Sequence, residues 1–259
     1  MRIGITERGD ASIDYSWVDK VSNMDGTILI TKNLTDKFIQ TVVNLHNSGT
    51  RLIVHATCTG LGGTVFEPNV HGYKWQLTQL KKLIDAGFPA SHCVLRIDPI
   101  FPTEYGLRRV CEVLHEFEHL GTDVTRIRIS VYDEYRHVKE RLKANGCQPC
   151  YGDRFYASSQ QMQFVANVLS RFPYRFEVCA EDILARNFPQ TFEQIGCVST
   201  KDFTVLGIKT VPNLSENGQK RNGCHCLTCK TELLTINFAV QTSASTATGV
   251  TDNYKETEI

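Results

Sequence analysis

The feature that most constrains the fold is a repeat of apolar segments that end in polar or charged residues, each followed by a helical pattern. We expect seven of these segments to be β-strands, because branched apolar residues dominate them and turn residues flank them. They are Arg2–Gly9, Gly26–Lys32, Leu52–Gly60, His92–Pro102, Arg126–Asp133, Phe176–Asp182 and Ile195–Ser199. Strands that alternate with helices predict βαβ units and a parallel sheet.

Apolar residues at helical spacing fill the intervals between these strands. The expected helices are Asn33–Asn47, Trp75–Ala86, Tyr105–Leu120, Tyr135–Ala144, Gln160–Arg171 and Thr200–Leu206, and a short amphipathic segment, Asp10–Val21, precedes them. Seven units without a break in composition favour an α/β fold of the (β/α) TIM-like barrel type, complete or incomplete. An open doubly wound sheet with solvated strand ends is the alternative.

The segment His92–Pro102 is the most informative of the expected strands. Arg96 and Asp98 stand two residues apart within an apolar run, so their side chains point to the same face. Two opposite charges on one face of a buried strand are costly unless they are paired or used. We expect Pro99 and Pro102 to close the strand, since proline cannot continue a hydrogen-bonded ladder.

Length and composition set outer limits on the fold. The 259 residues, 41% of them hydrophobic, suit one barrel-sized domain, which we place at 1–234. The polar stretch 235–259 predicts a disordered tail. With zero net charge, no signal peptide and no apolar stretch of about 18 residues, we expect a cytoplasmic protein without a membrane partner. Its ten cysteines are then reduced thiols or metal ligands.

Polar residues at the ends of the expected strands predict a site, because barrel active sites lie at the carboxyl ends of the strands. The expected catalytic residues are Glu7, His55, Asp98, Arg128, Asp133 and Glu181, with Lys32 and Ser130 at the same opening. Carboxylates mixed with cations suit general acid–base chemistry or the binding of a polar ligand. For each residue taken singly, a structural ion pair is the alternative.

The glycine-rich stretch Thr57–Gly63 follows the third expected strand, where a barrel holds a ligand loop. Backbone amides in such loops can hold an anion. We expect Lys32, Thr57, Gly62 and Gly63 to contact a cofactor. A flexible turn without a ligand is the alternative, because the spacing matches no dinucleotide or P-loop motif.

Cys224, Cys226 and Cys229 form a CxCxxC pattern that is suited to zinc or to part of an iron–sulfur cluster. Free thiols are the alternative for this group. Cys147 and Cys150 form a single CxxC, a weaker zinc motif because no second pair lies nearby in the sequence.

Several runs of residues resemble an uncharacterised bacterial family whose members are labelled DNA-repair-photolyase-like or radical-SAM proteins related to spore photoproduct lyase. The runs are ITERGD, ILITKNLT, VHATCTGLGGTVFEPNV, LRIDPIFPTEYGL, RIRISVYDEYRHVKER, FEVCAED, IGCVSTKD and CHCLTCKTELL, and they cover nearly all of residues 2–234. The resemblance implies a [4Fe–4S] cluster, S-adenosylmethionine, and a nucleic-acid base or related substrate.

The chain departs from that family after Leu234, where members usually carry a block close to CPxxCLYCYW that supplies a CxxxCxxC set of thiolates. Read in the shifted frame with permissible synonymous codons, residues 241–251 (QTSASTATGVT) become NKCLYCYWRD. We therefore hypothesise a frameshift near Thr235 and a defective member of the family. The nucleotide sequence tests this hypothesis directly.

Two other functions stay open at this level. One is a cofactor-independent barrel enzyme that acts on a small polar metabolite with Glu7, His55, Asp98 and Glu181. The other is a metal- or ligand-binding barrel without catalysis. Across these functions the expected substrate is a small molecule or a nucleic acid.

Overall fold

The computed structural model describes residues 2–209 and 230–234. Its strands are β1 (Ile3–Ile5), β2 (Gly26–Thr31), β3 (Leu52–Thr57), β4 (Cys93–Ile100), β5 (Arg126–Val131), β6 (Phe176–Val178), β7 (Phe192–Gln194) and β8 (Lys230–Glu232). Its α-helices are α1 (Asp36–Asn47), α2 (Tyr73–Asp85), α3 (Glu104–His119), α4 (Arg136–Ala144), α5 (Ser159–Leu169), α6 (Asp182–Asn187) and α7 (Thr200–Val205). Two 3-10 helices, η1 (Val18–Asn23) and η2 (Ala90–His92), complete the described elements.

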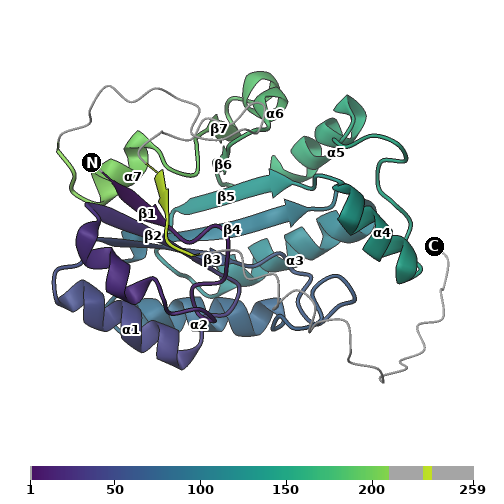
Figure 1. Cartoon of the computed structure of the whole chain (residues 1–259). Coiled ribbons are helices and arrows are strands. Elements are labelled where there is room, and N and C mark those ends of the chain that lie inside the picture. Colours follow the sequence, from purple (N-terminus) through teal and green to yellow (C-terminus); the bar gives the residue numbers. More distant parts are fainter. Residues whose placement is uncertain (1, 210–229, 235–259) are drawn as a thin grey trace.

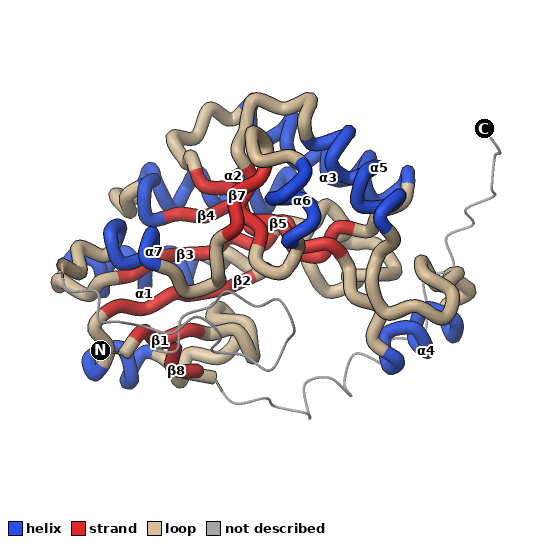
Figure 2. The backbone as a smooth tube through the Cα atoms, turned by 90° about the horizontal axis from the view of Figure 1, so that it is seen from above, coloured by secondary structure: helices blue, strands red, loops and turns tan. Residues whose placement is uncertain are grey.

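The strands form one sheet in the order β7-β6-β5-β4-β3-β2-β1-β8, and every adjacent pair is parallel (Figures 1 and 2). The predicted α/β class with a parallel sheet is therefore confirmed. From β1 to β7, neighbours in sequence are neighbours in the sheet, without the reversal of strand order that defines a doubly wound fold, and β8 pairs with β1. Within the described strands, β7 and β8 stand at the two ends of the hydrogen-bonded ladder.

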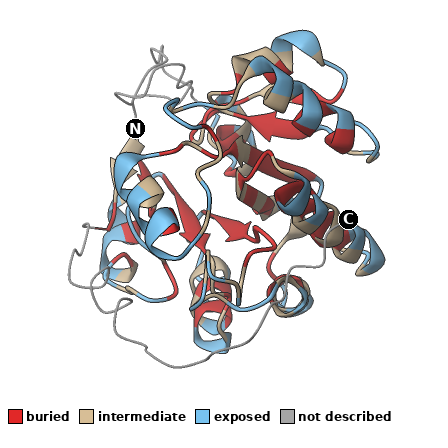
Figure 3. Ribbon diagram, turned by 90° about the vertical axis from the view of Figure 1, so that its right-hand side faces the viewer, coloured by how far each residue is buried: buried red, intermediate tan, exposed pale blue. Residues whose placement is uncertain are grey.

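Helices cover the sheet on both faces. The larger core lies between the sheet and α1, α2 and α3, where Phe38, Leu80 and Leu114 pack against outward-facing strand residues such as Leu95. A smaller core lies on the inner face, where Phe203 of α7 packs in a cluster with Ile3, Ile5, Ile28, Ile53 and Val94. Burial is concentrated on the strands and on the sheet-facing sides of the helices (Figure 3). Trp17, which precedes η1, is 0% exposed and belongs to the larger core.

Two expectations about strand ends were wrong. The segment Ile195–Ser199 is not a strand: β7 ends at Gln194, and Ser199 instead caps the N-terminus of α7 in a capping box with Asp202. Pro99 does not close β4, because the register shifts between Ile97 and Ile100. At such a bulge a residue without an N–H costs no regular ladder hydrogen bond.

Three described elements were not expected from the sequence, namely η2, α6 and β8. β8 extends the sheet beyond β1, and the Leu233 N–H donates to the Ile5 carbonyl at 2.8 Å. The approach is close, since a Cβ built on Gly4 would lie 2.7 Å from Leu233 Cδ1. Only glycine therefore fits at this position of β1 without displacing Leu233.

No helix in the described ranges combines the length and the apolar character that crossing a bilayer requires.

Candidate functional site

A cavity of about 1020 Å³ opens at the carboxyl ends of β2 to β5. Its lining comes from the residues after β2, the β3–α2 connection, the ends of β4 and β5, and α4, which lie together at one side of the molecule (Figure 1). Ligand sites in parallel sheets lie at this edge, because successive strand ends and their loops meet there. The cavity is also large enough for a drug-sized ligand.

Charged side chains at the strand ends of this cavity are paired with one another. Lys32 forms an ion pair with Glu67, and Glu67 also accepts a hydrogen bond of 2.5 Å from the Thr59 hydroxyl. Arg96 forms an ion pair with Asp98 on the same strand. Both pairs are partly buried, with exposed side-chain fractions of 33% and 10% for the first and 16% and 23% for the second. These charges are more strongly coupled than a surface pair would be.

The glycine-rich stretch is folded into a tight turn that brings Glu67 back to the strand ends. Gly62 and Glu67 form an isolated parallel β-bridge, and the Gly63 N–H donates to the Glu67 carbonyl at 3.0 Å. A Cβ at Gly62 would lie 2.0 Å from the His71 carbonyl oxygen, so the turn closes only around glycine. Because the Gly63 amide is used within the turn, that amide does not form the predicted anion site. Thr57, also predicted for the cofactor, is buried at the end of β3.

Aromatic residues also line the cavity. The ring centroids of Phe66 and Phe101 are 5.0 Å apart, and those of Phe101 and Tyr132 are 4.5 Å apart. Such distances are typical of favourable aromatic pairs. Val138 and Leu142 stand four residues apart on α4, so they share one face of the helix. Both line the cavity and pack in one cluster with these rings.

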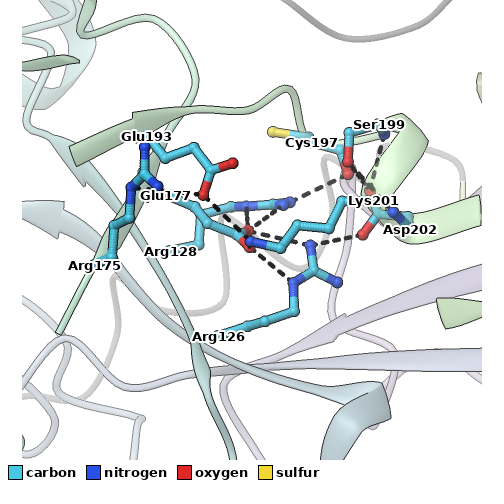
Figure 4. A network of polar contacts seen from close by, with 9 residues as sticks. All are labelled: Arg126, Arg128, Arg175, Glu177, Glu193, Cys197, Ser199, Lys201 and Asp202. Carbon is cyan, nitrogen blue, oxygen red and sulfur yellow. Dashed lines mark hydrogen bonds and ion pairs between the residues drawn. The ribbon is translucent and has the colours of Figure 1, made fainter. Parts of the chain in front are cut away.

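A buried charge network lies on the inner face of β5 and β6 (Figure 4). Arg126 and Arg128 stand two apart on β5, so both point inward, and Glu177 of β6 lies in register with Arg128. Glu177 accepts from Arg126 Nε at 2.8 Å and from Arg128 Nη2 at 2.7 Å, and Lys201 Nζ lies 3.0 Å away. Asp202 of α7 accepts from Arg126 Nη2 at 2.9 Å. The network thereby joins α7 to the sheet.

These contacts set the charge states on the inner face. Burial by itself would raise the pKa of Glu177, but the charge of Arg128 and the hydrogen bonds and charge of Arg126 hold that pKa at about 2. Burial, followed by the charges of Arg128, Arg96 and Arg126, lowers the pKa of His55 well below its usual value. His55 is therefore a neutral imidazole, 1% exposed, and its Nε2 has no hydrogen-bond partner among the described residues.

The structure brings together part of the predicted site. Lys32, Asp98, Ser130 and Asp133 line the cavity together. His55 and Arg128 were predicted at the same opening, but both are buried on the inner face, and neither lines the cavity.

Glu181 and Glu7 make contacts that hold the fold. Glu181 accepts hydrogen bonds from the Ser130 hydroxyl at 2.8 Å and from the Val131 N–H at 3.0 Å, so it links the β6–α6 connection to β5. Glu7 forms an ion pair with Lys230 and so joins the residues after β1 to β8. Neither carboxylate lines the cavity.

Several cavity residues were missed by the sequence analysis. These residues are Glu67, Phe66, Phe101, Tyr132 and Arg141. Phe101 and Tyr132 stand at the ends of two expected strands, but only polar strand-end residues were selected as candidates. Glu67 and Phe66 lie in a connection, where periodicity carries no information, and the only available signal was their place in the run VHATCTGLGGTVFEPNV.

No three His, Cys, Asp or Glu side chains within the described ranges come together as a metal-binding group. Burial raises the pKa of the Cys58 and Cys93 thiols to about 12, so both are protonated at neutral pH. The predicted ligands Cys224, Cys226 and Cys229, and the predicted tail at 235–259, lie outside the described residues.

A family model described as "Domain of unknown function (DUF1848)" matches residues 13–231. The match spans the whole cavity and the charge network. No curated protein matches the chain.

Proposed function

Since the chain belongs to the DUF1848 family of unknown function, we propose its activity from the cavity and from the resemblance to radical-SAM proteins. The proposed function is that of a radical-SAM-like, DNA-repair-photolyase-like enzyme acting in the cytoplasm. Its substrate is a nucleic-acid base or a related molecule, held in the cavity at the carboxyl ends of β2 to β5. The location of that cavity carries the proposal.

The order of the strands in the sheet supports this proposal. Eight parallel strands that follow one another around the sheet have the order of a (β/α) barrel, with β7 and β8 at the positions that a closed barrel would join. We propose that the sheet is an incomplete barrel and that the cavity is its opening. In such a fold the strand ends position the substrate, and a bound cofactor performs the difficult chemistry.

The proposal includes a defect in this chain. The resemblance assigns the cluster to a CxxxCxxC block that is absent after Leu234, and no described residues replace it. We therefore expect this chain to bind substrate without turnover, and we assign no reaction step to a cluster.

Restoring the missing block tests the proposal. The chain as printed is compared with a variant that carries the shifted reading frame after Leu234, both purified and reconstituted with iron and sulfide without oxygen. We expect iron in the ratio of a [4Fe–4S] cluster, and reductive cleavage of S-adenosylmethionine, only in the variant. Equal iron content in the two proteins, or a variant that binds no iron, would contradict the proposal.

A cofactor-independent enzyme that acts on a small polar metabolite is the second candidate. The observation that favours it is the presence of Asp98 and Asp133 in one cavity with Lys32 and Arg96, which supplies acids and bases without a cofactor. Turnover that survives replacement of Cys224, Cys226 and Cys229 by serine, but is lost in Asp98→Asn, would favour this candidate. Stoichiometric zinc without activity would instead indicate a metal-binding barrel.

Binding of a nucleic acid would be visible in the salt dependence of the affinity. Binding through phosphate contacts weakens steeply as salt is raised, because counterions are released on association. An affinity that does not change with salt would restrict the substrate to small molecules.

A further inference from the structure

The cavity is lined by two chemically different groups of residues. Charged residues form one group, and the Phe66, Phe101 and Tyr132 rings form the other. A ligand that contacts both groups must combine a polar part with an apolar part. The question is which charge the polar part carries and which shape the apolar part has.

The charges that line the cavity compensate one another. The cations are Lys32, Arg96 and Arg141, and the anions are Glu67, Asp98 and Asp133. Four of these charges are already joined in two ion pairs, Lys32 with Glu67 and Arg96 with Asp98.

This compensation discriminates between ligands by charge. An anionic group that approaches Lys32 or Arg96 is repelled by the carboxylate paired with that cation. A lone ammonium group that approaches one of these carboxylates is repelled by the cation beside it. These interactions are weakly screened because the four side chains are partly buried. A zwitterionic head group avoids both costs, since its carboxylate faces a cation while its ammonium faces an anion. In the complex, each charged group of the ligand and of the two ion pairs then has a group of opposite charge beside it.

The aromatic part of the lining favours a flat ring. The ring centroids of Phe66 and Phe101 are 5.0 Å apart and those of Phe101 and Tyr132 are 4.5 Å apart, so the three rings form a continuous aromatic wall. Tyr132 is 5% exposed and Phe101 is 8% exposed, which fixes the wall against the core. A planar ring gains stacking energy against such a wall in addition to the burial of its apolar surface.

We propose that the cavity binds a small molecule that joins a planar aromatic ring to a zwitterionic head group, and that it discriminates against analogues with a net charge. The ring lies against Phe66 and Phe101, and the head group lies between the Lys32–Glu67 and Arg96–Asp98 pairs. This inference rests on the proposed function only in using the same cavity. Its test involves no cluster and no turnover, so the two proposals fail separately.

Three probes with the same indole ring test the charge preference: L-tryptophan is a zwitterion, tryptamine a cation and 3-indolepropionate an anion at neutral pH. Dissociation constants are measured by ligand-observed NMR at one low salt concentration. We expect tryptophan to bind at least fivefold more tightly than either charged probe. In Phe66→Ala all three affinities should fall at least threefold, because the ring contact is common to the probes. Absence of binding by every probe, or tightest binding of a charged probe, would overturn the proposal.

Two variants that change the charge in opposite directions sharpen the test. Lys32→Met leaves Glu67 without its cation, so tryptamine should bind at least threefold more tightly than 3-indolepropionate. Glu67→Gln frees Lys32 and keeps an oxygen for the Thr59 hydroxyl, so the preference should reverse. Lys82→Met is the matched control, because Lys82 lies on α2 with a side chain 53% exposed and pairs with Asp36 away from the cavity. The same order of affinities in both cavity variants would also overturn the proposal, and circular dichroism confirms that each variant is folded.

Discussion

Replacement of Glu177 by glutamine should destabilise the protein severely without changing the shape of the side chain. The carboxylate accepts from two arginines at 2.7 to 3.2 Å and lies 3.0 Å from Lys201 Nζ, while its side chain is 1% exposed. Glu177→Gln leaves Arg126 and Arg128 buried with only Asp202 to balance them. Removing one member of a buried ion pair typically costs about 3–5 kcal/mol.

The pKa of Glu177 gives a second route to the same magnitude. A pKa of about 2 against an ordinary value of 4.5 corresponds to about 3 kcal/mol in favour of the folded state at neutral pH. The folded-state pKa is the lower of the two, so this stability is present above pH 4.5 and is lost as the pH falls toward 2. The difference in unfolding free energy between the native chain and Glu177→Gln should therefore shrink over that interval.

Urea unfolding followed by circular dichroism measures both effects. Glu193→Gln is the control, because Glu193 pairs with Lys201 at 3.4 Å and Arg175 at 3.9 Å but has a side chain 35% exposed. Its loss should cost less than about 1 kcal/mol. A cost for Glu177→Gln no larger than that of the control, or a difference that grows as the pH falls from 4.5, would refute the assigned role of the network.

Three further predictions follow from the described contacts. Gly62→Ala should lower the unfolding free energy by about 1–3 kcal/mol, because the added Cβ would lie 2.0 Å from the His71 carbonyl oxygen. An unchanged thermal unfolding midpoint would contradict the tight turn. Cys58 and Cys93 should resist iodoacetamide in the native protein and react after denaturation, because burial raises the pKa of both thiols to about 12. Peptide mapping that finds either cysteine alkylated in the native protein would contradict this prediction. His55 should remain neutral where ordinary histidines titrate, and a protonation step near the usual histidine pKa in its ¹⁵N NMR signals would show that the ring is not buried as described.

The sequence by itself determined the fold class, α/β with a parallel sheet. Apolar runs of strand length that alternate with amphipathic helices specify a parallel α/β sheet, because each pattern reflects local geometry and the face that must be buried. The sequence also predicted that Arg96 and Asp98 share one face and need a partner, and the structure pairs them with each other. Local periodicity was sufficient for both conclusions, since neither depends on residues far away in the chain.

The tertiary structure alone decided which polar residues form the site. Glu181 and Glu7 had the same strand-end signature as Asp98, yet contacts with Ser130 and Lys230, respectively 51 and 223 residues away, hold them in the fold. Conversely, Glu67 reaches the strand ends only because a turn closed around Gly62 brings it back. Strand register and loop closure fix such partners, and neither leaves a periodic trace in the sequence.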